Sequence, residues 1–375
     1  MTVRNVLITG AQGFLGRNLL QSLDRDPLIR TFPLGRSQLP DKLNSCAGEL
    51  DIVFHLAGTN RSDDESEFVE GNVRLTAQLC RTLAATGRNV PVVFSSSVHA
   101  GADSLYGRTK LSAEQELRNY SIQTGSAVYL ARLTNVFGKW ARPNYNSVVA
   151  TFCDAIQKRL QTTIHDPQSP LALCYIDDVV DAFWTVIKSG TEVSGIHQLD
   201  VRPIYETTVG ELHATLTRFR DTRGTGVIPD FSDDLTKRLF TTYLSYAPDE
   251  ELAYSVDLKK DDRGWLFEFL RSDAAGQIFI STTRPGITRG NHFHDSKVER
   301  FCVISGSGRI SFRRLDSDRE HSIDVSSDRI QIVEIPPGTL HSITNTGKSE
   351  MITLFWANEP FDPGNPDTWS MKASD

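Results

Sequence analysis

The sequence has few cysteines, no long apolar run and no excess of positive charge. Its five cysteines are scattered and form no C-x-x-C pair, a usage typical of reduced thiols in a cytoplasm. No apolar run approaches the roughly 18 residues that span a bilayer, and no signal-peptide pattern precedes the first apolar strand. The net charge of -7 provides no broad basic surface. We therefore expect a cytoplasmic protein that binds neither nucleic acid nor membrane.

Repeats and low-complexity tracts are also absent, and the 375 residues suffice for two or three domains. Up to about residue 247, short apolar runs alternate with helical patterns, which is typical of a doubly wound parallel α/β sheet. From about residue 258, brief β-rich segments are separated by Gly, Pro and Asp. We expect an α/β domain over residues 1–247, a turn-prone linker, and an all-β domain over residues 258–375.

A glycine turn follows the first apolar run, residues 6–9. Gly10, Gly13 and Gly16 stand three apart, and leucines at helical spacing come next. Glycines between a strand and a helix let the backbone approach a pyrophosphate, which then lies against the positive end of the helix. The pattern predicts a dinucleotide-binding turn.

The end of the second expected strand, residues 29–34, lacks an acid. No Asp or Glu occurs between Pro27 and Pro40, while Arg36 stands there and Arg17 is a second nearby cation. In this fold an acid holds the ribose hydroxyls of NAD, whereas an arginine suits the 2′-phosphate of NADP. We therefore expect NADP(H). At the end of the third strand, Ala57 and Gly58 are small enough for the adenosine and ribose to lie close.

A fourth strand ends in three serines, Ser95, Ser96 and Ser97, and Tyr106 and Lys110 follow at the start of a helix. Positions four apart share a helix face, so we expect the ammonium to lie near the phenol and to favour the phenolate. The phenol then exchanges a proton with a substrate oxygen that a serine holds. The eight residues between Ser97 and Tyr106 are few, so Ser95 and Ser96 remain alternatives.

These motifs resemble the extended short-chain dehydrogenases/reductases over about residues 1–245. The resemblance implies cofactor binding by the three glycines and a catalytic triad of Ser97, Tyr106 and Lys110. Val98 and His99 stand where family dehydratases carry an Asp-Glu pair, which disfavours dehydration. The segment R-x-x-N-V-F-G, residues 132–138, resembles the family's substrate side. Asn135, Arg142 and Tyr175 are then expected in a sugar-nucleotide pocket.

A second group of candidate ligands lies near the C-terminal end. His292 and His294 are two apart, so they point the same way from a strand, and Glu299 returns on the next strand. His341 is a fourth candidate. Imidazoles with one carboxylate suit zinc, and iron, manganese or nickel accept the same ligands.

These residues resemble the cupin superfamily, whose motif G-x5-H-x-H-x4-E-x6-G is met from Gly286 to Gly306. Its second motif, P-x-G-x-x-H-x-x-x-N, is met from Pro336 to Asn345, although Ile330 replaces an upstream glycine. The resemblance implies a jelly-roll domain with a metal held by His292, His294, Glu299 and His341.

The combination, with the run at residues 284–294, looks like the bifunctional capsule and O-antigen enzymes of the CapF and WbjC type. That resemblance implies a UDP-linked 2-acetamido-2,6-dideoxy-4-hexulose substrate on the route to N-acetyl-L-fucosamine. The cupin would invert C3, and the reductase would reduce the C4 ketone with NADPH to the β-L-talose sugar. It also implies a homodimer. Polar candidates for moving the C3 proton are His321, Lys297, Asp295 and Glu359.

Three alternatives remain open. In the first, the chain is a single-activity reductase whose cupin serves as a dimerisation module. The second is a nucleotide sensor without catalysis, against which Tyr106 and Lys110 argue. A 4-epimerase that keeps its nicotinamide tightly bound is the third.

Overall fold

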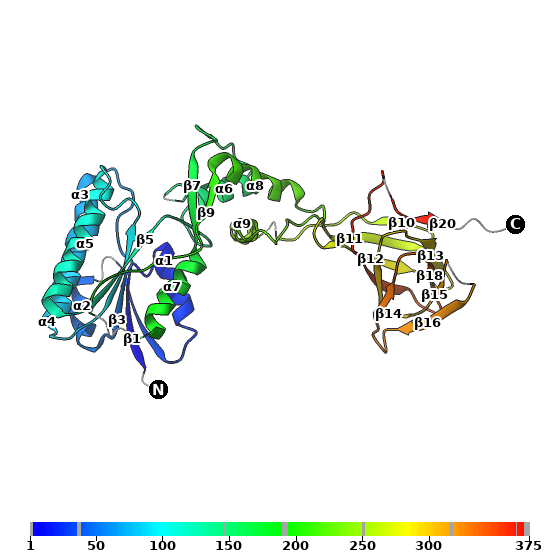
Figure 1. The fold of residues 1–375 in the computed structure, drawn as a ribbon, viewed down its shortest axis with the longest axis horizontal. Coiled ribbons are helices and arrows are strands. Elements are labelled where there is room, and N and C mark those ends of the chain that lie inside the picture. The colour runs from blue at the N-terminus through cyan, green and yellow to red at the C-terminus, as the bar shows by residue number, and fades with distance from the viewer. Residues whose placement is uncertain are drawn as a thin grey trace. The chain divides into compact units, whose positions relative to one another are not determined.

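Helices and strands are interspersed as far as residue 244, and strands alone follow the last helix among the described residues. A computed structural model (Figure 1) describes residues 3–370 apart from 36–38, 146, 190–193, 250–251, 316–317 and 365. The chain divides into two compact units: residues 1–217 with 238–248, and residues 218–237 with 249–375. The domain limits expected from the sequence stay a prediction. Within the described ranges, every helix is too short or too polar to cross a bilayer.

The first unit is built on a six-stranded parallel sheet with the order β2-β1-β3-β4-β5-β8. Its strands are β1 (Arg4–Thr9), β2 (Ile29–Leu34), β3 (Ile52–His55), β4 (Val92–Ser97), β5 (Ala127–Leu133) and β8 (Gly195–Gln198). The chain runs from β1 to β2 on one side and then to β3 on the other. A crevice for ligands therefore opens beyond the carboxyl ends of β1 and β3. This confirms the Rossmann-like sheet.

Helices cover both faces of this sheet (Figure 1). One face packs against α2 (Leu39–Cys46), α4 (Leu75–Ala85) and α5 (Leu105–Thr124), and the other against α1 (Phe14–Leu23) and α7 (Ile176–Ser189). Leu7 enters the first core, whereas its neighbours Val6 and Ile8 enter the second. Strands buried on both faces read as continuous apolar runs, which is why the sequence indicated a parallel sheet.

A smaller sheet and three helices complete the first unit and the start of the second. The sheet comprises β6 (Asn135–Phe137), β7 (Pro170–Tyr175) and β9 (Tyr205–Thr208), and the helices are α6 (Val148–Gln157), α8 (Val209–Thr222) and α9 (Asp234–Leu244). The sequence indicated no such sheet, because its short strands carry little periodicity. It presents Asn135 and Tyr175, two of the expected substrate residues.

The second unit has two antiparallel sheets, which confirms an all-β domain. One sheet comprises β10 (Lys259–Asp261), β11 (Gly264–Ser272), β12 (Gly276–Thr283), β19 (Met351–Ala357), β14 (Glu299–Ser305) and β17 (Val333–Ile335). The other comprises β16 (Glu320–Ser326), β15 (Ser307–Arg314), β18 (Thr339–Asn345), β13 (Thr288–Phe293) and β20 (Trp369–Ser370). Their shared core contains Phe301 and Phe355 from the first sheet and Ile310 and Ile343 from the second. Alternate residues of β18 are buried, so His341 points into this core.

Candidate functional sites

The glycine turn between β1 and α1 is packed too closely for side chains. Gly10 has a φ of +69°, and a β-carbon on it would lie 2.7 Å from the backbone nitrogen of Ala57. A β-carbon on Gly16 would lie 2.2 Å from the Gly10 carbonyl oxygen. Gly13 begins α1 without a side-chain cap, so the first amides of the helix face the crevice at the strand ends. The turn therefore has the form that a pyrophosphate requires.

The basis for the NADP(H) prediction lies partly outside the described residues, because Arg36 belongs to the segment 36–38. Arg17, the second cation, lies with its guanidinium carbon 4.8 Å from the centre of the Trp140 ring. Trp140 has a φ of 71° and is 37 % exposed. The choice between NAD and NADP stays a prediction.

The three serines that end β4 have different partners. The Ser95 hydroxyl donates to the His55 carbonyl at 3.4 Å, and the Ser96 hydroxyl donates to the Glu114 carboxylate at 2.6 Å. The Ser97 hydroxyl accepts from the His99 amide at 3.1 Å and lies close enough to the Tyr106 phenol to lower its pKa. Of the three, Ser97 is thus the serine placed beside the expected proton donor.

Lys110 is buried with its amine beneath the end of β4. Its Nζ donates to the Ser95 carbonyl at 2.6 Å and lies 4.3 Å from the centre of the Phe94 ring. Burial lowers the pKa of Lys110 to about 8, against the opposite effect of Glu114. The pKa of Tyr106 is raised, because burial outweighs the opposite effect of Ser97. A phenolate favoured by lysine, as expected from the spacing, is therefore not the state of this tyrosine in the protein alone.

The end of β3 is held by an asparagine from an irregular helical turn. A π-helical segment, Val69–Arg74, lies between α3 (Glu65–Phe68) and α4. The buried Asn72 accepts from the Thr59 amide at 2.9 Å and donates to the Thr109 hydroxyl at 3.2 Å. A β-carbon on Gly58 would lie 2.8 Å from Asn72 Oδ1. π-Helical turns are frequent at functional sites, and this one joins β3 to the helix that carries Tyr106.

The R-x-x-N-V-F-G segment has a structural role at its first residue. Arg132 forms two hydrogen bonds with the buried Glu114, at 2.9 and 2.7 Å, so it anchors α5 to β5. Asn135 is exposed and donates to the Ala172 carbonyl at 3.2 Å. Gly138 is required because a β-carbon there would lie 2.2 Å from Ile176. Asn135 therefore remains the substrate candidate of this segment.

Tyr175, another expected substrate residue, lies beside an arginine that no sequence motif indicated. Arg238 lies over Tyr175 and Tyr205, 4.9 and 5.4 Å from their ring centres, and pairs with Asp178. No motif surrounds Arg238, so only the fold brings it there. Arg142 stacks on Tyr145 at 5.5 Å.

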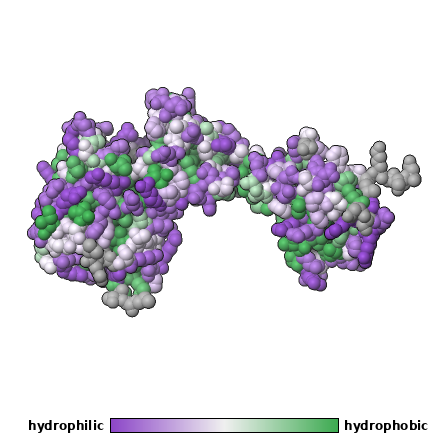
Figure 2. Space-filling view, viewed as in Figure 1, coloured by the Kyte–Doolittle hydropathy of each residue, from purple (hydrophilic) through white to green (hydrophobic). Residues whose placement is uncertain are grey.

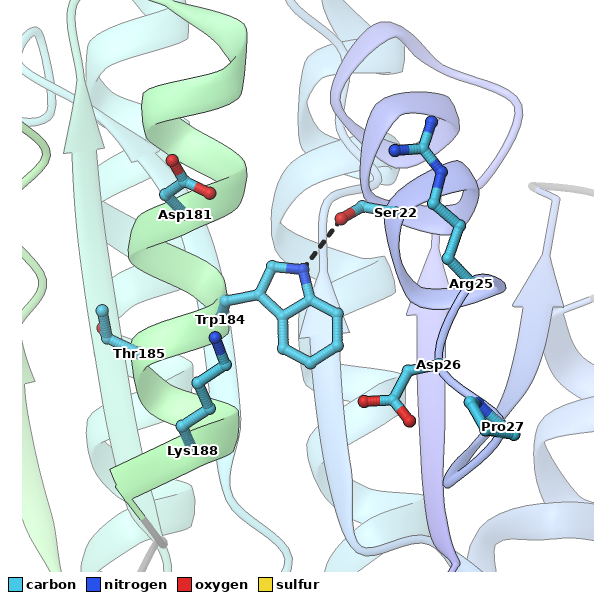
Figure 3. Close-up of a pocket in the computed structure, with 8 residues that line it drawn as sticks. All are labelled: Ser22, Arg25, Asp26, Pro27, Asp181, Trp184, Thr185 and Lys188. Carbon is cyan, nitrogen blue, oxygen red and sulfur yellow. Dashed lines mark hydrogen bonds between the residues drawn. The ribbon is translucent and has the colours of Figure 1, made fainter.

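A cavity of about 400 Å³ next to Tyr145 is lined by Arg61, Asn144 and the start of α6. A larger cavity, of about 610 Å³, lies between the end of α1 and α7 around Trp184 (Figure 3). The Trp184 indole donates to the Ser22 hydroxyl at 2.8 Å there. The glycine turn precedes α1 at the carboxyl ends of the strands, whereas this larger cavity lies at the far end of α1. It is therefore not the cofactor crevice.

In the second unit, the four candidate metal ligands come together. His292 lies on β13 opposite His341 on β18, His294 follows β13 directly, and Glu299 opens β14. One ligand atom from each of the four lies within 4.8 Å of the others. His294 Nε2 and His341 Nε2 are 3.2 and 3.1 Å from Glu299 Oε2. Those three atoms are buried without hydrogen-bond partners among the described residues.

Backbone carbonyls fix the tautomers of two of the three histidines. His294 Nδ1 donates to the Asp367 carbonyl and His341 Nδ1 donates to the Thr339 carbonyl, which leaves both Nε2 lone pairs free. Burial, then His341, lowers the pKa of His292 to about 4. Burial alone would raise the pKa of Glu299, but His294 and His341 outweigh it and lower that pKa to about 2. Burial alone would lower the pKa of His294, but Glu299 and the Asp367 carbonyl outweigh it and raise that pKa. Three imidazoles around an ionised carboxylate are a donor set for a divalent cation, which would take the place of a proton between His294 and Glu299.

Of the four polar side chains considered for proton transfer, Lys297 is buried and His321 and Asp295 are exposed. Glu359 is half-buried and accepts from the Ser296 hydroxyl at 3.2 Å. Lys297 Nζ donates to the Pro366 carbonyl at 3.4 Å and influences His292 electrostatically. Of the four, Lys297 is therefore the one that is both buried and electrostatically coupled to the ligand cluster.

Each of the two units matches a known protein family. Residues 6–198 match the NAD dependent epimerase/dehydratase family, and residues 259–369 match the polysaccharide biosynthesis C-terminal domain. A UDP-2-acetamido-2,6-beta-L-arabino-hexul-4-ose reductase of Pseudomonas aeruginosa is 40% identical over 97% of this chain and 98% of its own.

Solved structures agree. The capsular polysaccharide assembling protein CapF of Staphylococcus aureus superposes with a TM-score of 0.89 at 37% identity, over 98% of this chain and 100% of its own. A structure of CapF with the inhibitor 3-isopropenyl-tropolone gives 0.83 at 34% identity, with the same coverage. A Methanobrevibacter ruminantium UDP-N-acetylglucosamine 4-epimerase, 17% identical with a TM-score of 0.56, covers 66% of this chain and 99% of its own and shares the fold. The chain therefore belongs to the CapF family of capsular polysaccharide assembling proteins, in which an NAD dependent epimerase/dehydratase domain precedes a polysaccharide biosynthesis C-terminal domain.

Proposed function

We propose that the chain performs two consecutive reactions on a UDP-linked 2-acetamido-2,6-dideoxy-4-hexulose. The second unit, a cupin jelly roll in this proposal, epimerises C3. The first unit then reduces the C4 ketone with NADPH to UDP-2-acetamido-2,6-dideoxy-β-L-talose. The observation that carries this is the presence, in one chain, of a buried ligand cluster and a Ser-Tyr-Lys group, in a relative of a hexulose reductase.

The epimerase half depends on a cation in the His292, His294, Glu299 and His341 cluster. Three buried ligand atoms without hydrogen-bond partners fit such an ion, because without it each would be desolvated and gain no compensating interaction. A bound divalent cation, zinc in this proposal, would supply Lewis acidity that makes a hydrogen beside a ketone removable. The backbone carbonyls of Asp367 and Thr339 hold the two imidazoles in the ligating tautomer.

The reductase half uses Tyr106 as the proton donor to the C4 oxygen. NADPH bound at the glycine turn would supply the hydride. Tyr106 is protonated because burial raises its pKa, and a protonated phenol is the form that a ketone reduction requires. Ser97 lies beside the phenol, and Lys110 holds the strand end through the Ser95 carbonyl. Reduction removes the carbonyl that permits epimerisation, so it would fix the new C3 configuration.

One experiment tests both halves: incubation of the UDP-4-hexulose in deuterated water, with and without NADPH, followed by NMR. We expect deuterium at C3 without NADPH and the talose product with it. His341→Ala should abolish the exchange and leave NADPH oxidation measurable on substrate already epimerised. Tyr106→Phe should reduce NADPH oxidation by about 100-fold or more and leave the exchange intact, because general acid catalysis contributes that much.

Absence of C3 exchange in the unmodified protein would exclude the epimerase and leave a reductase with a structural cupin. Purified protein that carries NAD and turns over without added NADPH would instead indicate a 4-epimerase. Lack of any turnover would revive the sensor alternative.

We further propose that the protein is a homodimer paired through β14 and the edge strand β17. Ile304, Ile330 and Ile332 are 45, 58 and 65 % exposed on or beside these strands. Figure 2 shows apolar surface on the second unit where β14 lies. An exposed apolar edge strand is a template for another strand, and a second copy of the same edge is self-complementary about a two-fold axis.

A further inference from the structure

The C-terminal segment of the chain lies directly against the ligand cluster. β20 pairs with β13, so Ser370 lies opposite His292 and Trp369 opposite Phe293. Just before β20, Asp367 has a φ of 36°, in the left-handed region that asparagine and aspartate tolerate better than most residues. This segment is 68 to 78 residues away from the first three ligands in sequence, yet it forms one wall beside them.

Asp367 makes an unusually large set of contacts with the loop that separates His294 from Glu299. Its carboxylate accepts from the amides of Asp295, Ser296 and Lys297 at 2.8, 3.0 and 3.0 Å, and from the Ser296 hydroxyl at 3.0 Å. Its backbone carbonyl accepts from His294 Nδ1. The side chain of Asp367 therefore binds the loop between two ligands, and its backbone binds one of those ligands.

We propose that Asp367 is a positioning residue of the metal centre, which it preorganises by clamping the His294–Glu299 loop and the His294 ring. This rests on the proposed metal site. Three consecutive amides that converge on one carboxylate define the path of the loop, and the loop path sets where His294 and Glu299 meet. Without the carboxylate, the loop must be ordered by the cation itself, and that ordering reduces the affinity.

The contacts also explain why the carboxylate is needed in addition to the carbonyl. The carbonyl fixes the tautomer and rotation of one ring, but it does not restrain Glu299. The carboxylate holds residues 295–297, and the Val298 amide is held next to them by the Asn358 side chain at 2.8 Å. The whole loop between the two ligands is thereby tied to the C-terminal segment.

Asp367→Asn is the sharpest test, because asparagine suits the same backbone conformation and keeps the carbonyl, but removes the charge and half of the accepting capacity. Asp362→Asn is the matched control. Asp362 lies in the same segment, and among the described residues its carboxylate accepts from the Gly364 amide alone, at 2.8 Å. Affinities for zinc are measured on full-length metal-free protein by competition with a chromophoric chelator, and cobalt(II) absorption spectra report the coordination geometry.

We expect Asp367→Asn to weaken zinc binding by about 10- to 100-fold and to change the cobalt spectrum. The control should match the unmodified protein in both. Ser296→Ala removes one of the four hydrogen bonds to the carboxylate and should weaken zinc binding by a smaller factor. Such a graded loss distinguishes removal of the clamp from misfolding. Equal affinity in Asp367→Asn and the unmodified protein would overturn the clamp while leaving the metal site in place. An unmodified protein that binds neither zinc nor cobalt would instead overturn the proposed metal site itself.

Discussion

At the scale of the residue, Lys110 has a poorly solvated charge with a measurable consequence. Its pKa is about 8 in the folded chain and 10.5 for an ordinary lysine, so the unfolded chain binds more protons between these values. Stability then rises with pH across this window, because burial of the charged form is costly only while the amine is protonated. Below about pH 8 the penalty is fully present.

We therefore predict that the unfolding free energy of the nucleotide-free protein, relative to Lys110→Met, increases by about 2 kcal/mol between pH 7.5 and 9.5. The measurement is urea unfolding of both proteins at each pH, and the quantity of interest is the change in their difference. A difference that stays constant with pH would show that Lys110 keeps an ordinary proton affinity in the fold.

Where a motif is contiguous, the sequence predicted which side chains come together. The ligands His292, His294 and Glu299 lie within eight residues, and alternation along a strand is enough to bring them to one side. Asp367 was missed because its contacts join residues more than 70 positions apart and belong to no motif. Arg132 opens the segment that resembles the family's substrate side, but its partner is the buried Glu114 on α5, a contact that the motif does not indicate.

At the scale of the element, the start of α1 leaves no room for added volume. An Ala for Gly substitution inside a helix normally stabilises it by about 1 kcal/mol. At Gly16 the added carbon would meet the Gly10 carbonyl at 2.2 Å, and a backbone atom cannot move aside cheaply. We predict that Gly16→Ala lowers stability by about 1 to 3 kcal/mol and weakens NADPH binding at least 10-fold.

Gly48→Ala is the control, because a β-carbon there meets nothing within 4 Å. Thermal unfolding and NADPH fluorescence titration give both quantities. Equal NADPH affinity in Gly16→Ala and Gly48→Ala would mean that this turn does not hold the pyrophosphate.

Elements were predicted from the sequence to the extent that apolar periodicity determines them. β2 has the limits that its apolar run indicates, since both ends are marked by polar or turn residues. The apolar alternation at residues 330–335 is that of one continuous strand, but only Val333–Ile335 pairs, with β14. Ile330 and Ile332 stay outside the strand and exposed, so apolar composition alone misjudged its length.

At the scale of the whole molecule, two unlike units were foreseeable because the periodicity changes from mixed helix and strand to strand alone. The proposed interface was not foreseeable, because exposure of Ile304, Ile330 and Ile332 depends on which strand forms the sheet edge. Fully burying one isoleucine side chain contributes about 1.5 to 3 kcal/mol. Six such side chains across a two-fold axis give a sum comparable with the estimated cost of association.

We accordingly predict that Ile332→Glu converts a dimer into a monomer in sedimentation velocity, because two carboxylates would meet near the axis without partners. Ile122→Glu is the matched comparison, since Ile122 is 83 % exposed on α5, in the other unit. If the dimer survives Ile332→Glu and dissociates with Ile122→Glu, pairing occurs through α5 and the β17 edge is not the interface. If the unmodified protein sediments as a monomer, the proposed pairing is wrong as well. The expected pattern, loss with Ile332→Glu alone, would place the interface on the unit that carries the ligand cluster.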